Sequence, residues 1–258
     1  RFLSCCVQKS SCCKTENAAE SLSKKIGYTE EELAAAPGGA NLGLGCGNPV
    51  ALASIKEGEI IVDLGSGPGL DCFLAAGKAG KNGKVIGIDM TPDMIERARE
   101  NAKKGRIENV EFRLGDIEKI PVEDNTADAI ISNCVINLAP DKRKVFGEAF
   151  RVLKPGGRIM VSDMVSLKEL PGFIKDSIDA YIGCLGGAMI KDEYLDAIKS
   201  AGFVDVRIVN ESYLPVEYKH LVDDPAVKTI IKNLKLSPEN IKAITESFVS
   251  IKVHAVKP

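Results

Sequence analysis

A glycine-rich turn is the first feature of this chain of 258 residues that could hold a ligand. The segment VDLGSGPG spans residues 62–69 and follows the apolar run 59–64, which predicts a buried strand. Glycines allow a sharp turn and let backbone N–H groups approach a ligand without a clash at Cβ. Asp89 ends the next apolar run, where an acidic side chain can accept both hydroxyl groups of a ribose. The turn and Asp89 together predict a site for a nucleoside.

The residues of this turn favour S-adenosylmethionine over a dinucleotide. The dinucleotide pattern G-x-G-x-x-G needs a glycine at position 70, where this chain has Leu70. Asp63 stands directly before the turn, where its charge would repel a pyrophosphate and attract the ammonium group of an amino acid. The alternative is a glycine turn that binds nothing, and it leaves the joint occurrence of strand, turn, helix and Asp89 unexplained.

Apolar runs that alternate with amphipathic helices must position this turn. Strands are predicted at residues 59–64, 84–89, 110–114, 127–132, 158–162, 204–209 and 247–256. Helices are predicted after Thr29 with its capping partner Glu32, after Thr91-Pro92, from about Asp141, and over 171–201. The alternation indicates βαβ units, and therefore an α/β fold with a doubly wound, mainly parallel sheet.

Three parts are expected along the chain. Residues 1–20 carry doubled cysteines among Ser, Lys, Asn and Glu, which predicts a mobile cysteine-rich arm. Residues 21–165 are expected to form an S-adenosylmethionine-binding core with an N-terminal lid. Residues 166–258 are expected to form an α+β extension on the substrate side.

Cysteines supply a second kind of chemistry, and the chain has eight: Cys5, Cys6, Cys12, Cys13, Cys46, Cys72, Cys134 and Cys184. Cys134 follows the fourth predicted strand, at the edge of the sheet where ligands bind in open α/β folds. Cys46 lies in GLGCGNP before the first strand, and Cys184 lies in GCLGGA after the fifth. These three thiols can converge on one point, whereas Cys72 on a predicted helix is expected to be a buried packing residue.

Three convergent thiolates suit a soft, thiophilic centre. Zinc would also bind them but normally takes a fourth ligand. Trivalent arsenic prefers three sulfurs in a trigonal pyramid, and its lone pair can attack a sulfonium methyl group in line. Because that nucleophile carries no proton, it needs no general base. This agrees with the positions of His220 and His254, which lie in the tail and are expected to be surface or packing residues.

The motifs of the core resemble those of class I S-adenosylmethionine-dependent methyltransferases. The segment 59–69 resembles their first motif, 87–90 their second, and 115–118 their adenine-contacting turn, while Asn133 follows the fourth strand. The resemblance covers about residues 55–165 and implies a Rossmann-like fold. It implies a cofactor site made by Asp63, Gly65, Ser66, Gly67, Asp89, Met90, Asp116, Ile117, Glu118 and Asn133.

The cysteine segments resemble those of the arsenite methyltransferases over about residues 27–190. The resemblance implies that Cys46, Cys134 and Cys184 bind trivalent arsenic and that an N-terminal cysteine exchanges disulfides with Cys46. The arm offers four candidates for that exchange. Methylation formally oxidises arsenic, so thioredoxin or a glutathione-type thiol is an expected partner.

Composition limits the other function classes. Lys and Arg number 34 and Asp and Glu 36, a net charge of −2 that argues against binding of nucleic acid or a membrane surface by bulk charge. Neither a membrane-spanning run nor a secretory signal is visible, so a reducing cytoplasmic location is expected. Two alternatives remain: a quinone-type methyltransferase acting on carbon or oxygen, and a thiol-rich arsenic- or metal-binding protein.

Overall fold

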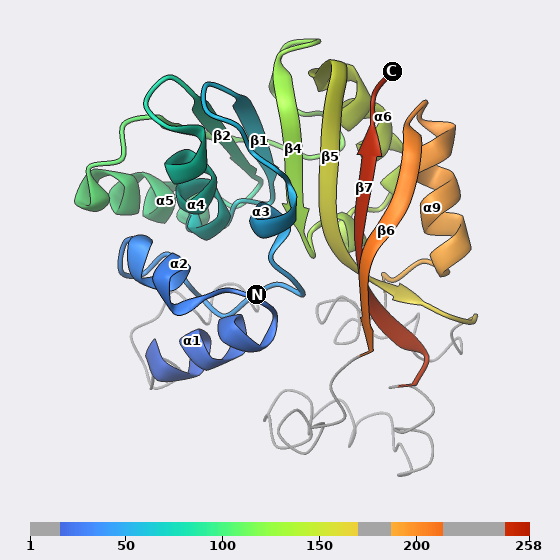
Figure 1. Ribbon diagram of the computed structural model, residues 1–258, viewed down its shortest axis with the longest axis horizontal. Coiled ribbons are helices and arrows are strands. Elements are labelled where there is room, and N and C mark those ends of the chain that lie inside the picture. The colour runs from blue at the N-terminus through green and yellow to red at the C-terminus, as the bar shows by residue number, and fades with distance from the viewer. Residues whose placement is uncertain (1–15, 170–186, 214–245) are drawn as a thin grey trace.

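The computed structural model describes residues 16–169, 187–213 and 246–258. Seven strands form one sheet in the order β3-β2-β1-β4-β5-β7-β6 (Figure 1). Their bounds are β1 Ile60–Leu64, β2 Lys84–Asp89, β3 Val110–Leu114, β4 Ala127–Asn133, β5 Leu153–Ser166, β6 Val204–Tyr213 and β7 Phe248–Val256. Strands β1 to β5 pair in parallel, and β7 runs antiparallel to both β5 and β6. The predicted α/β fold is therefore confirmed.

Helices cover both faces of the sheet. Those described are α1 Glu16–Lys25, α2 Glu30–Ala35, α3 Pro49–Leu52, α4 Leu70–Ala79, α5 Pro92–Gly105, η2 Ile136–Leu138, α6 Lys142–Val152 and α9 Lys191–Ser200. Strand β1 serves two cores, because successive side chains of a strand point to opposite faces. Ile61 packs with side chains of α4 and α5, whereas Val62 and Leu64 pack with those of α6 and α9. The sheet is doubly wound, as predicted.

The helix starts follow the capping signals of the sequence. Thr29 caps α2 in a capping box: its side chain accepts from the Glu32 N–H, and the Glu32 side chain accepts from the Thr29 N–H. Asp141 caps α6 by accepting from the Lys144 N–H, and Pro92 is the first residue of α5. Helix α5 ends at Gly105, and the next residue, Arg106, takes the left-handed conformation, with φ of +52°.

The predicted C-terminal extension is more closely tied to the core than expected. Strand β5 runs from Leu153 to Ser166, beyond the predicted 158–162, and pairs with β7 along Arg158–Ser166. Strands β7 and β6 therefore complete the same sheet. Within the helix predicted over 171–201, the structure describes α9, Lys191–Ser200; residues 187–190 are not helical, and 170–186 lie outside the described residues.

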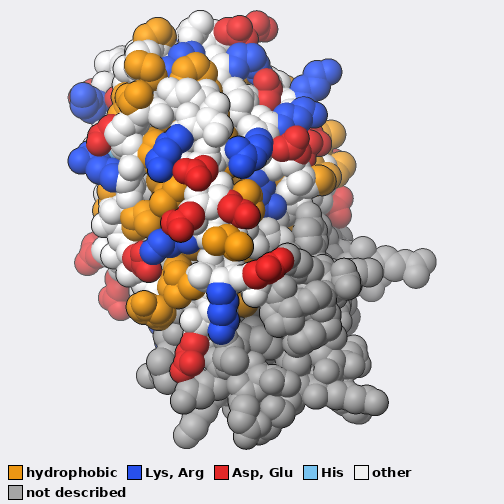
Figure 2. Space-filling model, turned by 90° about the vertical axis from the view of Figure 1, so that its right-hand side faces the viewer, with side chains coloured by type: hydrophobic (Ala, Val, Ile, Leu, Met, Phe, Trp, Pro, Cys, Tyr) orange, Lys and Arg blue, Asp and Glu red, His pale blue; other side chains and the backbone are white. Residues whose placement is uncertain are grey.

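The predicted boundary at residue 20 falls inside helix α1, because residues 16–20 are its first half. Residues 1–15, with their four cysteines, lie outside the described residues. None of the described helices is long and apolar enough to cross a membrane. Figure 2 shows the face over β6 and α9, where Lys and Arg side chains alternate with Asp and Glu.

An ion pair fastens the start of β1 to β5. The Arg158 guanidinium donates to both carboxylate oxygens of Glu59, at 2.9 and 2.7 Å, and to the carbonyls of Ala53 and Ser54. Both charged side chains are largely buried, with 14% and 13% exposed. Removing one partner of an ion pair shielded from water in this way is destabilising, because the other charge is left buried without compensation.

We expect Glu59→Gln to lower the free energy of unfolding by about 1.5–3 kcal/mol, the usual contribution of a hydrogen bond to a charged group. Urea unfolding would measure it. Glu57→Gln is the matched control, because Glu57 is exposed and should change stability little. Equal stability of the two variants would show that the pair contributes nothing.

Candidate functional site

The glycine-rich turn is fastened to the neighbouring strand β2. The N–H groups of Gly65 and Ser66 both donate to the Ile88 carbonyl, at 2.8 and 2.9 Å. The Asp89 carboxylate accepts from the Gly67 N–H at 2.9 Å and from the Thr91 N–H at 2.8 Å. The acid predicted to bind ribose is thus held rigidly beside the turn, at the carboxyl edge of two adjacent parallel strands.

Two positions in this turn require glycine for different reasons. Gly67 has φ of +51°, and a Cβ there would meet nothing within 4 Å, so the backbone borders open space. Gly65 has φ of +72°, and a Cβ there would lie 2.5 Å from the Val135 side chain. The Ser66 side chain is buried, and its hydroxyl has no hydrogen-bond partner among the described residues. An open backbone edge and an unused hydroxyl are what a polar ligand would satisfy.

The residues expected to contact adenine lie next to Asp89. Met90 is 74% exposed, an unusual position for a large apolar side chain, and offers a surface for a flat ring. The Gly115 N–H donates to the Asp89 carbonyl at 3.0 Å, which brings the turn 115–118 alongside. Within that turn, Asp116 accepts from the Glu118 N–H, whereas Ile117 is buried in the core. The Glu118 carboxylate accepts from the Asp141 N–H, so these residues shape the turn.

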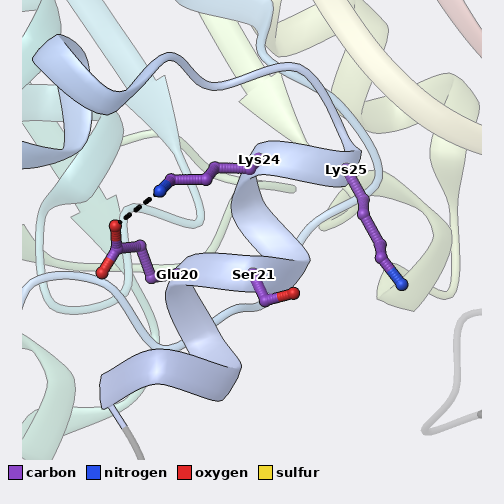
Figure 3. A pocket seen from close by; sticks show the side chains of 4 residues that line it. All are labelled: Glu20, Ser21, Lys24 and Lys25. Carbon is purple, nitrogen blue, oxygen red and sulfur yellow. Dashed lines mark ion pairs between the residues drawn. The ribbon is translucent and has the colours of Figure 1, made fainter.

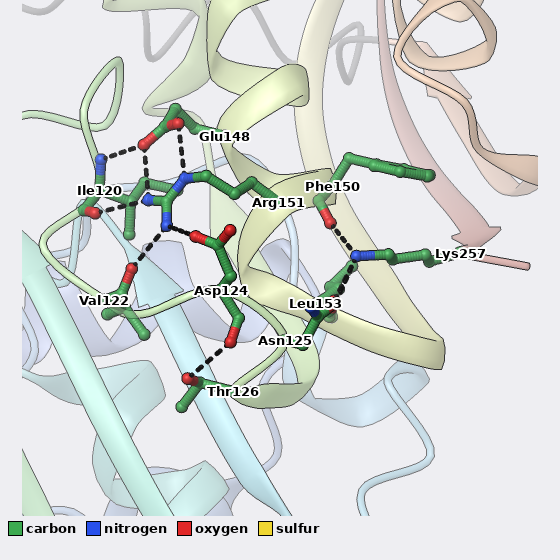
Figure 4. Close-up of polar contacts among 10 residues, drawn as sticks. All are labelled: Ile120, Val122, Asp124, Asn125, Thr126, Glu148, Phe150, Arg151, Leu153 and Lys257. Atoms are coloured by element: carbon green, nitrogen blue, oxygen red, sulfur yellow. Dashed lines mark hydrogen bonds and ion pairs between the residues drawn. The ribbon is translucent and has the colours of Figure 1, made fainter.

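An arginine that the sequence did not single out anchors the loop after this turn (Figure 4). The Arg151 guanidinium donates to the carbonyls of Ile120 and Val122, at 2.9 Å each, and to Asp124 at 2.6 Å. It also pairs with Glu148, whose carboxylate accepts from the Ile120 N–H. The loop is therefore held by two residues of α6, Arg151 and Glu148, and no sequence motif marks such a role.

Cys46 and Cys134 lie together and form a disulfide across a sequence separation of 88 residues. Their Cα atoms are 5.9 Å apart. Cys134 directly follows β4 and has φ of +60°, a left-handed conformation that is uncommon outside glycine and typical of functional sites. The Cys134 N–H donates to the Ser162 carbonyl of β5 at 2.8 Å. Two of the three predicted thiols therefore meet, and Cys184 lies outside the described residues.

The Asn133 side chain holds the Cys46 segment against the end of β4. Its Oδ1 accepts from the Cys46 N–H at 3.0 Å, and its Nδ2 donates to the Gly47 carbonyl at 2.7 Å. A Cβ at Gly45 would lie 2.7 Å from this amide. The same Nδ2 lies within hydrogen-bond distance of the Tyr28 hydroxyl, at 2.9 Å. Asn133 was expected at the cofactor site; in this structure its amide bonds Cys46 and Gly47.

Two buried carboxyl groups lie behind the turn. Burial raises the pKa of Asp63 well above its usual value, and the charge of Asp71 raises it further. The Cys72 thiol donates to Asp63 at 3.1 Å, so this buried packing residue also makes a polar contact. Burial raises the pKa of Asp71 to about 6, although Tyr28 and Asn133 both donate to it. A cationic ligand near these acids would stabilise their ionised forms.

A third buried acid, Asp163 of β5, was not predicted. Its carboxylate and the sulfurs of Cys46 and Cys134 all lie within 4.8 Å of one another. The Tyr194 hydroxyl donates to it at 3.1 Å, and so does the Met164 N–H. Burial raises the pKa of Asp163 to about 7. Asp163 lies near the carboxyl end of a parallel strand. Asp89 was predicted from that kind of position, so the same criterion would have identified Asp163.

The remaining polar features lie elsewhere. Helix α1 carries a surface pocket lined by Glu20, Ser21, Lys24 and Lys25 (Figure 3). Lys24 is paired there with Glu20 and with Glu30, so its charge is already balanced. His254 lies on β7, with Nδ1 3.8 Å from the Asp205 carboxylate, and His220 lies outside the described residues.

Comparison with known proteins agrees with this geometry. A family described as a methyltransferase domain matches residues 55–202, more than half of the chain. The chain belongs to this methyltransferase domain family. The chain is 49% identical over 197 residues to the arsenite methyltransferase of Halobacterium salinarum, covering 76% of this chain and 50% of that protein. It is 38% identical over 186 residues to the human arsenite methyltransferase, covering 69% of this chain and 49% of that one.

The chain is also similar to proteins of known structure. The arsenic(III) S-adenosylmethionine methyltransferase of Chlamydomonas reinhardtii has a TM-score of 0.67 and 31% identity, covering 93% of this chain and 73% of that one. A phosphoethanolamine N-methyltransferase of Haemonchus contortus, at 20% identity and TM-score 0.65, covers 84% of this chain and 54% of that one and shares the fold. The chain spans about half the length of the curated arsenite methyltransferases it matches.

Ionisation of Asp71 should make the stability of this methyltransferase domain depend on pH. The raised pKa means that the folded chain keeps the Asp71 proton between pH 3.8 and about 6, where the unfolded chain has lost it. The free energy of unfolding therefore falls as the pH rises through this range. Two pKa units correspond to at most about 3 kcal/mol.

We expect Asp71→Asn to reduce this fall, which denaturant unfolding at a series of pH values would measure. Asp63 and Asp163 act in the same direction, so part of the dependence remains. Asp196→Asn is the control, because Asp196 is exposed and pairs only with Lys199 among the described contacts. An unchanged slope in Asp71→Asn would contradict the assignment of a raised pKa to this group.

Proposed function

We propose that this chain transfers the methyl group of S-adenosylmethionine to thiol-bound trivalent arsenic. The observation that supports this most directly is the meeting of Cys46 and Cys134 at the carboxyl edge of the sheet, next to the glycine-rich turn. Val135, the residue after Cys134, packs against Gly65 of the turn. A thiol-bound substrate and a ligand of the turn would therefore be neighbours. The names of the similar arsenite methyltransferases agree with this assignment.

Each part of S-adenosylmethionine is assigned to residues at the carboxyl edge of the sheet. Asp63 and the backbone of Gly65 and Gly67 would hold the methionine end, with Ser66 as a further hydrogen-bonding group. The Asp89 carboxylate would accept the ribose hydroxyls, and Met90 would cover the adenine. Asp116, Ile117 and Glu118 would shape the adenine side through their turn. When bound, S-adenosylmethionine supplies an electrophilic methyl group on a positively charged sulfur.

Arsenic ligation requires the reduced forms of Cys46 and Cys134, because a disulfide sulfur offers no thiolate. Cys184 is proposed as the third ligand. The arsenic lone pair forms the new As–C bond, the S–C bond breaks, and its electron pair stays on sulfur. Arsenic is thereby oxidised from the trivalent to the pentavalent state. Two electrons from a pair of thiols return it to the trivalent state and leave a disulfide such as Cys46–Cys134.

An external thiol must then reduce that disulfide for another turnover. We propose thioredoxin or a glutathione-type thiol as the partner and the reducing cytoplasm as the location. One of Cys5, Cys6, Cys12 and Cys13 is proposed to exchange disulfides with Cys46. The substrate is small, so neither nucleic acid nor a membrane is proposed as a partner.

The thiols carry the sharpest test of this function. We expect Cys134→Ser and Cys46→Ser each to abolish arsenite methylation while leaving affinity for S-adenosylmethionine nearly unchanged. Serine is similar in size, but its hard, protonated oxygen is a poor ligand for a soft centre. Loss of alignment also matters, because in-line attack needs reacting atoms about 3–3.5 Å apart. Mass analysis of the products, with arsenite and a thiol present, would measure turnover.

Cys72→Ser is the control for removal of a thiol, since a serine hydroxyl can still donate to Asp63. It should still methylate arsenite. Arsenite methylation at the parent rate in the Cys134 and Cys46 variants would reject these thiols as arsenic ligands. Absence of methylated arsenic from the parent protein would reject arsenic as substrate and favour a quinone-type methyltransferase. Stoichiometric arsenic binding with no methylated product would instead indicate an arsenic-binding protein.

A second test concerns the cofactor. We expect Asp89→Ala to weaken binding of S-adenosylmethionine about tenfold to a hundredfold, because losing a hydrogen bond to a charged group costs about 1.5–3 kcal/mol. Calorimetric titration would measure the affinity. Asp93→Ala is the matched control, since Asp93 is an exposed acid in the first turn of α5. Equal affinities of the two variants would remove Asp89 from the site.

A further inference from the structure

We propose that reduced Cys46 and Cys134 form, together with Asp163, a binding site for a divalent cation of the zinc class. The inference goes beyond the proposed function, because it assigns a second kind of ligand to this place and gives a role to a carboxylate that arsenic does not require. It also makes such cations competitors of arsenic.

The three ligand groups come from separate parts of the chain and meet at one point. Cys46 belongs to the segment before α3, Cys134 directly follows β4, and Asp163 lies on β5. Their two sulfurs and a carboxylate oxygen lie within 4.8 Å of one another. Asp163 is buried, while Cys46 is partly exposed, which leaves an approach from solvent. Opening the disulfide lets the sulfurs separate to the spacing that two ligands of one ion need.

The Asp163 carboxylate is oriented as a ligand would have to be. The Tyr194 hydroxyl donates to Oδ2 at 3.1 Å, and the Met164 N–H donates to Oδ1 at 3.1 Å. Tyr194 is itself fixed, because it is fully buried and its ring packs edge-on against Phe146, with centroids 5.3 Å apart. Ligating carboxylates are commonly held by such hydrogen bonds from a second layer of residues.

The combination of sulfur and oxygen donors favours zinc over arsenic. Zinc accepts thiolate sulfur and carboxylate oxygen together, and three protein ligands with an open fourth position are typical of its non-structural sites. Trivalent arsenic is thiophilic and gains little from a carboxylate. Asp163 should therefore matter for zinc and not for arsenic. Binding converts two thiols to thiolates and releases their protons to the buffer.

Zinc affinity of the full chain provides the test, measured by competition with a chromophoric chelator under a phosphine reductant. Because the arm could bind zinc by itself, every protein carries Cys5, Cys6, Cys12 and Cys13 as serine. We expect Asp163→Asn to weaken zinc binding by more than about tenfold, and Tyr194→Phe by about tenfold, the smaller loss typical of a second-layer partner. Cys134→Ser should weaken it as well.

Asp196→Asn is the control with the same change of charge on an exposed acid, and it should bind zinc like the reference protein. Arsenite affinity of Asp163→Asn should equal that of the reference, which also verifies that the thiols are correctly placed. Zinc affinity of Asp163→Asn equal to that of Asp196→Asn overturns the proposal. Joint loss of zinc and arsenite binding overturns it too, since Asp163 would then only support the structure.

The outcome is independent of methylation. If zinc binding depends on Asp163 but the protein forms no methylated arsenic, this inference stands and the proposed function is rejected. If the protein methylates arsenic but its zinc binding does not depend on Asp163, the proposed function stands and this inference is rejected.

Discussion

The Asn133 amide is the contact on which the arrangement of the site depends. It bonds both the N–H of Cys46 and the carbonyl of Gly47, so one side chain fixes a segment that has no regular structure of its own. The Ser250 hydroxyl of β7 adds a bond to the Cys46 carbonyl at 2.8 Å. These contacts are independent of the disulfide, so they can keep the Cys46 segment beside Cys134 when the two thiols are reduced.

The same amide connects the segment to the N-terminal helices. Tyr28, between α1 and α2, bonds Asp71 of α4 at 2.7 Å and lies beside Asn133. Figure 1 shows α1 and α2 at the edge of the sheet where β4 ends. Asn48 adds a second tie, because its amide donates to the Gly27 carbonyl and to Glu32 of α2. The N-terminal helices thus cover the edge through polar contacts that are buried or partly buried.

Burial of carboxyl groups shapes the electrostatics of this edge. Asp63, Asp71 and Asp163 are almost fully buried, and in each case removal from water raises the pKa. Keeping such groups costs stability at neutral pH, since their ionised forms lose hydration. A cationic ligand would recover part of that cost. The acids divide between two places, with Asp63 and Asp71 behind the glycine-rich turn and Asp163 beside the thiols.

Local sequence determined the elements and the glycine-rich turn. Apolar runs and capping residues predicted β1 to β4 and the starts of α2, α5 and α6, because these signals act within a few residues. Strand order at the carboxyl edge then followed from βαβ geometry, which brought Asp89 and Cys134 to the right edge. Only the tertiary structure decided the pairing of Cys46 with Cys134, the use of Asn133 as an anchor, the place of Asp163, and the membership of β6 and β7 in the main sheet. Each of these is a contact between segments far apart in the chain. Such a contact depends on how the whole sheet packs, and no local sequence pattern predicts that packing.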